Sequence, residues 1–320
     1  MGLLVDGIWQ DKWYDTSENG GKFERQASKF RGTIGGEAGA EHPPESGRYH
    51  LYVAYACPWA HRALILRQLK GLTQHIDVSV VNPDMLGDGW SFSDYPGSTG
   101  DKLYHNDYLH QLYTKAKHDV TTRVTVPVLW DKQTQSIVNN ESADIIRIFN
   151  SDFNALTGGS QDFYPAPLRE EIDNINNTVY HAINNGVYKA GFATTQSAYE
   201  EAVEVLFEAL DALETRLSTQ RYLVGNQITE ADWRLFTTLI RFDAVYHGHF
   251  KCNIRQIADY PNLYGYMKEL YQYPGVASTV NFDHIKRHYY YSHTMINPTQ
   301  VISVGPKQDL MTPHNREKIN

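Results

Sequence analysis

Residues 49–69 combine a strand, a cysteine, a proline and a helix in succession, and this order constrains the fold more than any other feature. The apolar, aromatic run 49–56 predicts a buried strand. Apolar residues at helical spacing over 64–69 predict a helix. Pro58 suits the first helical turn, where its missing N–H removes no hydrogen bond. Cys57 is therefore expected at the start of a helix that follows a buried strand.

A cysteine at a helix start favours the thiolate, because the helix dipole and the first backbone N–H groups stabilise negative charge. The pKa of a thiol so placed falls from about 8.5 to roughly 3.5–7.5. Cys57 is accordingly expected to be a nucleophile; the alternative is a small buried apolar residue. No second cysteine follows three residues later, where a redox pair would have its partner, and His61 stands four residues on. The expected chemistry is monothiol, with the resolving thiol supplied from outside.

Length and charge restrict the class of protein. A chain of 320 residues is long enough for two ordinary domains. The net charge of −8 argues against nucleic acid or an anionic membrane as partner. No apolar run approaches the roughly 20 residues that a membrane span needs, and the N-terminus does not resemble a signal peptide. Two cysteines predict no disulfide framework and favour a reducing, cytoplasmic location.

The first half of the chain reads as a mixed sheet with helices. After the helix at Cys57, strands are expected at 76–81, 123–130 and 137–138, and a helix at 142–149. The long connection 82–122 is expected to be functional or partly helical, with a short helix within 104–117.

The second half reads as helical. Residues 168–183 and 206–217 each carry a continuous apolar stripe at helical spacing. Thr229 is a plausible N-cap, and Asp232, three residues later, can complete a capping box. A further helix is expected at 262–271. The predicted domain organisation is an N-terminal extension (1–48), an α/β domain (49–150), a linker (151–167), a helical domain (168–282) and a C-terminal extension (283–320).

Several motifs together carry a resemblance to a known family. They are Cys57-Pro58-Trp59-Ala60-His61-Arg62, Val80-Val81-Asn82-Pro83, Gly89-Trp90, the run 123–130, Asn140-Glu141-Ser142, the run 185–193 and the run 280–285. On these residues the chain resembles the glutathione transferase superfamily, and within it the glutathionyl-hydroquinone reductases of the xi class. The likeness covers nearly the whole chain.

The resemblance implies a thioredoxin-like N-terminal domain, an all-helical glutathione-transferase C-terminal domain and a homodimer. It also implies reduction of glutathionyl-hydroquinones by glutathione. In such an enzyme Cys57 would take glutathione from the substrate as a mixed disulfide, and a second glutathione would release oxidised glutathione. Glutathione is thus the expected cosubstrate.

The same resemblance assigns a glutathione-binding site. Val126, before a cis Pro127, is expected to pair through its backbone with the cysteinyl unit; the alternative is a trans proline in an edge strand. Ser142 would hold the γ-glutamyl carboxylate at a helix start and Glu141 would accept from its amine; the alternative is helix capping.

Two further residues complete the expected glutathione site. Arg123 would bind the glycyl carboxylate as a bidentate fork, and the alternative is a surface arginine. Trp90 would pack on the tripeptide, and the alternative is an ordinary core residue.

Tyr188 and Tyr289 match tyrosines expected around the quinol ring, where a phenol can hydrogen-bond an oxygen and donate a proton to the ring carbon. The alternative for each is a half-buried tyrosine. Cys252 has no helix-start signal and is expected to be structural. No metal-ligand constellation and no dinucleotide or ATP motif occurs in the sequence, so neither a metal nor a nucleotide is expected.

Two other functions remain open on the sequence. One is a dehydroascorbate reductase or thiol transferase of the omega kind; Tyr188, Tyr289 and the long extensions favour the quinone reductase over it. The other is a non-catalytic module kept for protein association. Such a module needs no cysteine at the helix start, so the Cys57-Pro58 pair argues against it.

Overall fold

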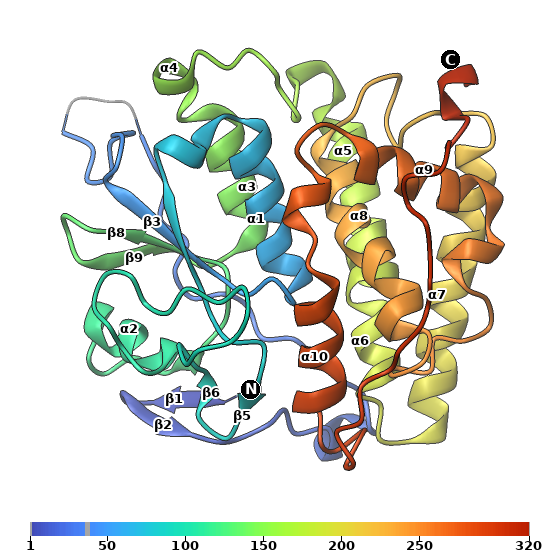
Figure 1. Ribbon diagram of the computed structural model, residues 1–320. Coiled ribbons are helices and arrows are strands. Elements are labelled where there is room, and N and C mark those ends of the chain that lie inside the picture. Colours follow the sequence, from blue (N-terminus) through green and yellow to red (C-terminus); the bar gives the residue numbers. More distant parts are fainter. Residues whose placement is uncertain (1, 36–38, 320) are drawn as a thin grey trace. The chain divides into compact units, whose positions relative to one another are not determined.

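The structure is a computed structural model that describes residues 2–35 and 39–319 (Figure 1). The chain forms two compact units. Unit 1 comprises residues 1–13, 26–161 and 279–292, and unit 2 comprises residues 14–25, 162–278 and 293–320. The expected domain boundaries remain predictions, and residues 36–38 of the predicted N-terminal extension lie outside the described residues.

A four-stranded mixed sheet forms the centre of unit 1, in the order β4-β3-β8-β9. β3 (Tyr49–Val53) runs parallel to β4 (Asp77–Val80) and antiparallel to β8 (Val128–Asp131), which pairs antiparallel with β9 (Ser136–Asn139). Every residue of β3 is buried, as expected of a central strand covered on both faces. The predicted thioredoxin-like fold of this half is confirmed.

Helices flank this sheet. α1 (Pro58–Leu69) and α3 (Ser142–Ser151) pack against each other and lie side by side in Figure 1. The long connection contains the hairpin of β5 (Met85–Leu86) and β6 (Gly89–Trp90), followed by α2 (Leu109–Ala116). α10 (Phe282–Ser292), far along the chain, also belongs to unit 1 and contacts β5.

The predicted N-terminal extension, called the N-terminal arm below, contains two regular strands. β1 (Leu3–Val5) and β2 (Ile8–Gln10) form an antiparallel hairpin, and β1 also pairs with β7 (Thr122–Arg123). The hairpin turns through Asp6 and Gly7, both at positive φ, which is the geometry that an Asp-Gly turn favours. The predicted single strand 123–130 is therefore two strands, β7 and β8, which belong to different sheets.

Unit 2 is helical, as expected. Its helices are α5 (Arg169–Thr178), α6 (Gly186–Gly191), α7 (Gln196–Leu217), α8 (Glu230–Arg241) and α9 (Pro261–Gln272). The predicted capping box at the start of α8 is present: the Thr229 N–H donates to Asp232, which is fully buried.

The apolar stripe predicted over 168–183 is not one continuous α-helix. α5 ends at Thr178 and a π-helical segment, Val179–Asn184, follows; a second such segment, Phe242–Tyr246, follows α8. The predicted linker 151–167 contains a short helix, α4 (Asn154–Thr157). Across the described residues, no helix combines the length and the apolar character needed to cross a bilayer.

Candidate active site

Cys57 occupies the N-cap of α1 with extended backbone angles (φ −78°, ψ 121°), and Pro58 takes the first helical position. The Cys57 carbonyl accepts the first helical hydrogen bond, from the His61 N–H at 3.0 Å. The structure thus has the predicted succession of a strand, a cysteine, a proline and a helix. The helix start presents backbone N–H groups and the positive dipole end beside this thiol.

The cis-proline turn lies directly against Cys57. The Val126–Pro127 peptide bond is cis, as predicted. The thiol of Cys57 donates to the carbonyl oxygen of Val126, with 3.6 Å between sulfur and oxygen. Both side chains are largely buried, at 9% and 4% exposed. The candidate nucleophile therefore adjoins the segment before β8 whose backbone is expected to pair with a bound peptide.

The start of α3 carries the next two candidates. Glu141 is the N-cap, and its carboxylate accepts from the Ala143 N–H at 3.1 Å and from the Ser28 hydroxyl at 2.9 Å. Ser142 is buried. Arg62, from α1, donates to the Ser142 hydroxyl oxygen at 3.4 Å. Helix capping, the alternative for Glu141, is thus part of what this carboxylate does.

Arg62 was not singled out as a functional residue by the sequence analysis. It is 2% exposed, and its guanidinium carbon lies 4.6 Å from the centre of the Trp59 ring. Arg62 thus places a buried positive charge beside the start of α3. The signal that could have found it is its place five residues after Cys57, on the same helix.

Arg123 is buried rather than on the surface. Its two terminal nitrogens donate to the backbone carbonyls of Lys12, and of Trp13 at 3.1 Å. The expected alternative of a surface arginine is therefore wrong, because the N-terminal arm covers this side chain. The carbonyl contacts give the guanidinium a role in holding the arm.

Trp90 lies in β6 and is 3% exposed. Its ring stacks on His288 of α10, with centroids 4.7 Å apart and 22° between the planes. His288 in turn contacts Tyr289 edge-on at 5.2 Å, and Tyr289 is 1% exposed. The structure thus links Trp90 to Tyr289 through His288, which the sequence analysis did not include among the site residues.

Tyr188 lies on α6, in unit 2, and is 8% exposed. Aromatic rings surround it: Phe23, Phe192, Tyr246 and Phe250 have centroids within 5.5–6.5 Å. It is more buried than the half-buried alternative implies.

Cys252 is fully buried, and burial raises the pKa of its thiol. This is the inert environment expected of a structural cysteine. Among the residues that the structure describes, no group of three or more His, Cys, Asp or Glu side chains could hold a metal ion.

Comparison with known proteins identifies the family. The N-terminal domain model of the glutathione S-transferases matches residues 56–152, and the C-terminal domain model matches residues 196–269. The chain is 57% identical to the glutathionyl-hydroquinone reductase YqjG of Escherichia coli (strain K12), over 99% of each chain. The chain belongs to the glutathione S-transferase family.

Solved structures of glutathione transferases agree with this assignment. The glutathione-bound structure of YqjG superposes with a TM-score of 0.91 and 52% identity in that alignment, covering 99% of each chain. The xi-class glutathione transferase of Natrialba magadii superposes with a TM-score of 0.94 and 48% identity, covering 100% of this chain and 97% of that one. The resemblance inferred from the motifs is confirmed, including the xi class.

Within this glutathione transferase, unit 1 brings several candidates together and leaves one apart. Cys57 adjoins Val126, and Arg62 ties α1 to Ser142 beside Glu141. Arg123 is instead turned toward the N-terminal arm. Tyr188 belongs to unit 2 with its own aromatic neighbours.

Proposed function

We propose that this chain reduces glutathionyl-hydroquinones to hydroquinones, with glutathione as the reductant. The observation that carries the proposal is the position of Cys57: a thiol at a helix start, adjoining the carbonyl of the residue before a cis proline. The high identity to a glutathionyl-hydroquinone reductase over nearly the whole chain supports the substrate class.

The first half of the reaction transfers glutathione to the enzyme. The Cys57 thiolate attacks the glutathione sulfur of the substrate, and the carbon–sulfur bond breaks. The ring carbon takes the electron pair of that bond and one proton, which gives the free hydroquinone. The two sulfurs become a mixed disulfide, so the ring carbon is reduced and the sulfurs are oxidised.

The second half regenerates the thiolate. A second glutathione, as thiolate, attacks the glutathione sulfur of the mixed disulfide, which yields oxidised glutathione and frees Cys57. An external thiol is needed because Cys252 is fully buried, and burial raises the pKa of its thiol and disfavours the nucleophilic form.

Four residues have support as glutathione ligands. The Val126 backbone would pair with the cysteinyl unit, and Ser142 at the start of α3 would hold the γ-glutamyl carboxylate. Glu141 would accept from the α-amine, and Trp90 would pack on the tripeptide. Arg123 has the least support, since a glycyl carboxylate would compete with the carbonyls of Lys12 and Trp13 for its terminal nitrogens.

Tyr188 and Tyr289 would act on the hydroquinone ring in this proposal. Each has a phenol that can hydrogen-bond a quinol oxygen or supply the proton that the ring carbon takes up. Both are largely buried, which suits a site that excludes water.

Single-turnover chemistry tests the proposal. Enzyme mixed with a methylated glutathionyl-hydroquinone and no free glutathione should release one equivalent of hydroquinone and stop. Mass spectrometry should find one glutathionyl group on the Cys57 peptide. Cys57→Ser should abolish the release, and the matched variant Cys252→Ser should keep it. Retained activity in Cys57→Ser, or repeated turnover without glutathione, would overturn the assignment.

A homodimer in the cytoplasm is part of the same proposal. The family likeness supports the dimer, and the two free cysteines suit a reducing compartment. Light scattering of the purified chain should give twice the mass of one chain.

A further inference from the structure

Arg25, in the N-terminal arm, lies over the ring of Tyr188. Its guanidinium carbon is 4.9 Å from the centre of the Tyr188 ring and 5.5 Å from that of Phe23. Its Nε donates to the side-chain oxygen of Asn185 at 2.9 Å. Asn185 immediately precedes α6, three residues before Tyr188, so the arginine is oriented by the same segment that carries the tyrosine.

Earlier in the chain, two hydrogen bonds join the arm at Gly20 and Gly21 to Thr194 and Thr195, and we call this contact the glycine lock. The Thr195 hydroxyl donates to the Gly20 carbonyl at 2.9 Å, and the Thr194 N–H donates to the Gly21 carbonyl at 3.1 Å. Gly21 has φ +85°, and a Cβ there would lie 2.6 Å from the Thr195 hydroxyl oxygen. A glycine is therefore required at this point. Because the glycine lock holds Gly21 in place, it also limits where Arg25, four residues later, can lie.

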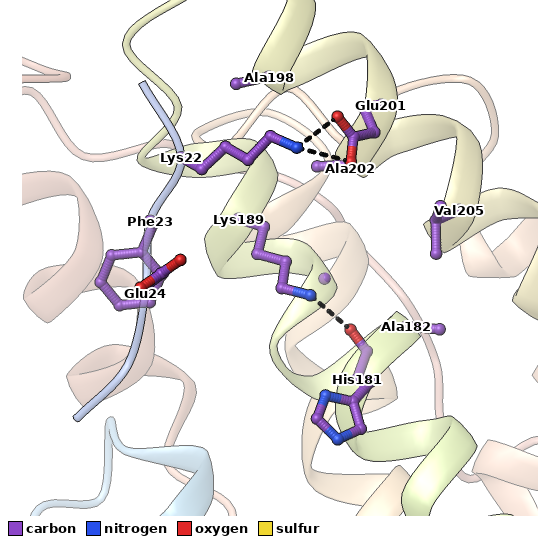
Figure 2. A pocket seen from close by; sticks show the side chains of 11 residues that line it. Lys22, Phe23, Glu24, His181, Ala182, Lys189, Ala198, Glu201, Ala202 and Val205 are labelled. Carbon is purple, nitrogen blue, oxygen red and sulfur yellow. Dashed lines mark hydrogen bonds and ion pairs between the residues drawn. The ribbon is translucent and has the colours of Figure 1, made fainter. Parts of the chain in front are cut away.

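Between the lock and Arg25 the arm spans a pocket. The pocket has a volume of about 250 Å³ and is bounded by Lys22, Phe23 and Glu24 of the arm on one side (Figure 2). Opposite them lie helical residues, among them Lys189 and Glu201; Lys22 pairs with Glu201 at 2.8 Å. Phe23 is packed against aromatic rings on one side of this stretch and the pocket lies on the other; the bond to Asn185 and the glycine lock hold Arg25 in place.

The surroundings of Tyr188 make a cation on its ring significant. Phe23, Phe192 and Phe250 contact the ring and offer no hydrogen bond to a phenol oxygen. Tyr246 and the positively charged Arg25 also contact this ring. Beside buried aromatic rings a phenolate is costly to form, and a positive charge close to the ring lowers that cost.

We propose that Arg25 is a positioning residue for Tyr188: it fixes the ring and stabilises the negative charge that forms on the phenol when the proton leaves. The inference rests on the proposed function, in which Tyr188 supplies a proton to the ring carbon. Arg25 acts through the tyrosine and not on the substrate. The N-terminal arm thereby contributes to the first half of the reaction.

The test compares three variants in the single-turnover release of hydroquinone. Arg25→Met removes the charge and keeps the length, and it should slow release about fivefold to tenfold. The alkaline limb of its pH–rate profile should move to higher pH, because the phenol becomes a weaker acid. Arg25→Lys keeps the charge and should keep the limb near its original pH. Resolution by added glutathione should be unchanged in both variants.

Arg169→Met is the matched control, because Arg169 lies 5.0 Å over the ring of Tyr164 on another surface of unit 2. It should change neither rate nor profile. Tyr246→Phe shows whether the alkaline limb belongs to that tyrosine instead, which would contradict the inference. Equal profiles in Arg25→Met and Arg25→Lys, with circular dichroism confirming the fold, would reduce Arg25 to a structural role.

The two proposals fail in different ways. If Cys57→Ser still releases hydroquinone, the proposed function is wrong. If Cys57→Ser is inactive and Arg25→Met behaves like Arg169→Met, only the role of Arg25 is wrong.

Discussion

The imidazole Nε2 of His61 lies 2.7 Å from the hydroxyl oxygen of Thr279, and His61 is fully buried. His61 is on α1, four residues after Cys57, and Thr279 stands three residues before α10. One hydrogen bond therefore connects α1, which begins directly after the candidate nucleophile Cys57, with a segment more than 200 residues later in the chain. This hydrogen bond gives the buried His61 a structural role.

Thr279→Val should lower the free energy of unfolding by about 1–3 kcal/mol, because it leaves the buried His61 nitrogen without this partner. Urea denaturation followed by circular dichroism measures the change. Thr279→Ser, which keeps the hydroxyl, should recover most of the loss. A valine variant as stable as the parent would show that the bond contributes nothing.

The two cysteines should differ sharply in their rate of alkylation by iodoacetamide. Cys57 is at a helix start that favours the thiolate, whereas Cys252 is fully buried and burial raises the pKa of its thiol. Peptide mapping of the native protein should find label on Cys57, and label on Cys252 only after denaturation. Equal labelling of both thiols in the native protein would contradict this difference.

Acid should lower the folding stability of unit 1 by protonating the carboxylate of Asp131. Burial alone raises the pKa of this carboxyl, but hydrogen bonds from Arg48 and with His42 outweigh it and lower the pKa to about 2. The carboxylate thus stabilises the fold fully above its unfolded pKa of about 3.9, and this contribution disappears as the pH falls toward 2.

Asp131→Asn should therefore be less stable than the parent at neutral pH, with a difference that shrinks between about pH 4 and pH 2. Denaturant unfolding at several pH values measures this. Asp119→Asn is the control, since that carboxylate is exposed. A constant difference across the acid range would mean that the Asp131 charge is not linked to folding.

Local chemistry made much of this structure predictable. The N-cap at Cys57, the proline in the first turn of α1 and the Thr229–Asp232 capping box depend on neighbours within a few residues. Such local patterns can be recognised from the sequence alone. The motifs at Cys57, Val126 and Ser142 likewise pointed to the family, because their spacing reflects one fold.

Long-range pairing made the rest unpredictable. Nothing near Arg123 indicates that the carbonyls of Lys12 and Trp13 will cover it, more than 100 residues away. The contact between Arg25 and Tyr188 spans the chain in the same way. The π-helical segment Val179–Asn184 keeps its apolar stripe, so periodicity alone does not distinguish it from a regular helix.

The division of the chain also bears on how the protein is made. Unit 1 includes residues 279–292, which follow nearly all of unit 2 in the sequence. A ribosome releases the N-terminus first, and most domains complete their folding as they emerge. Unit 1 therefore receives its last helix, α10, only after most of the helical unit has been synthesised. The β5 strand, which α10 contacts, lacks this partner until then, and truncation after residue 161 would leave unit 1 without α10.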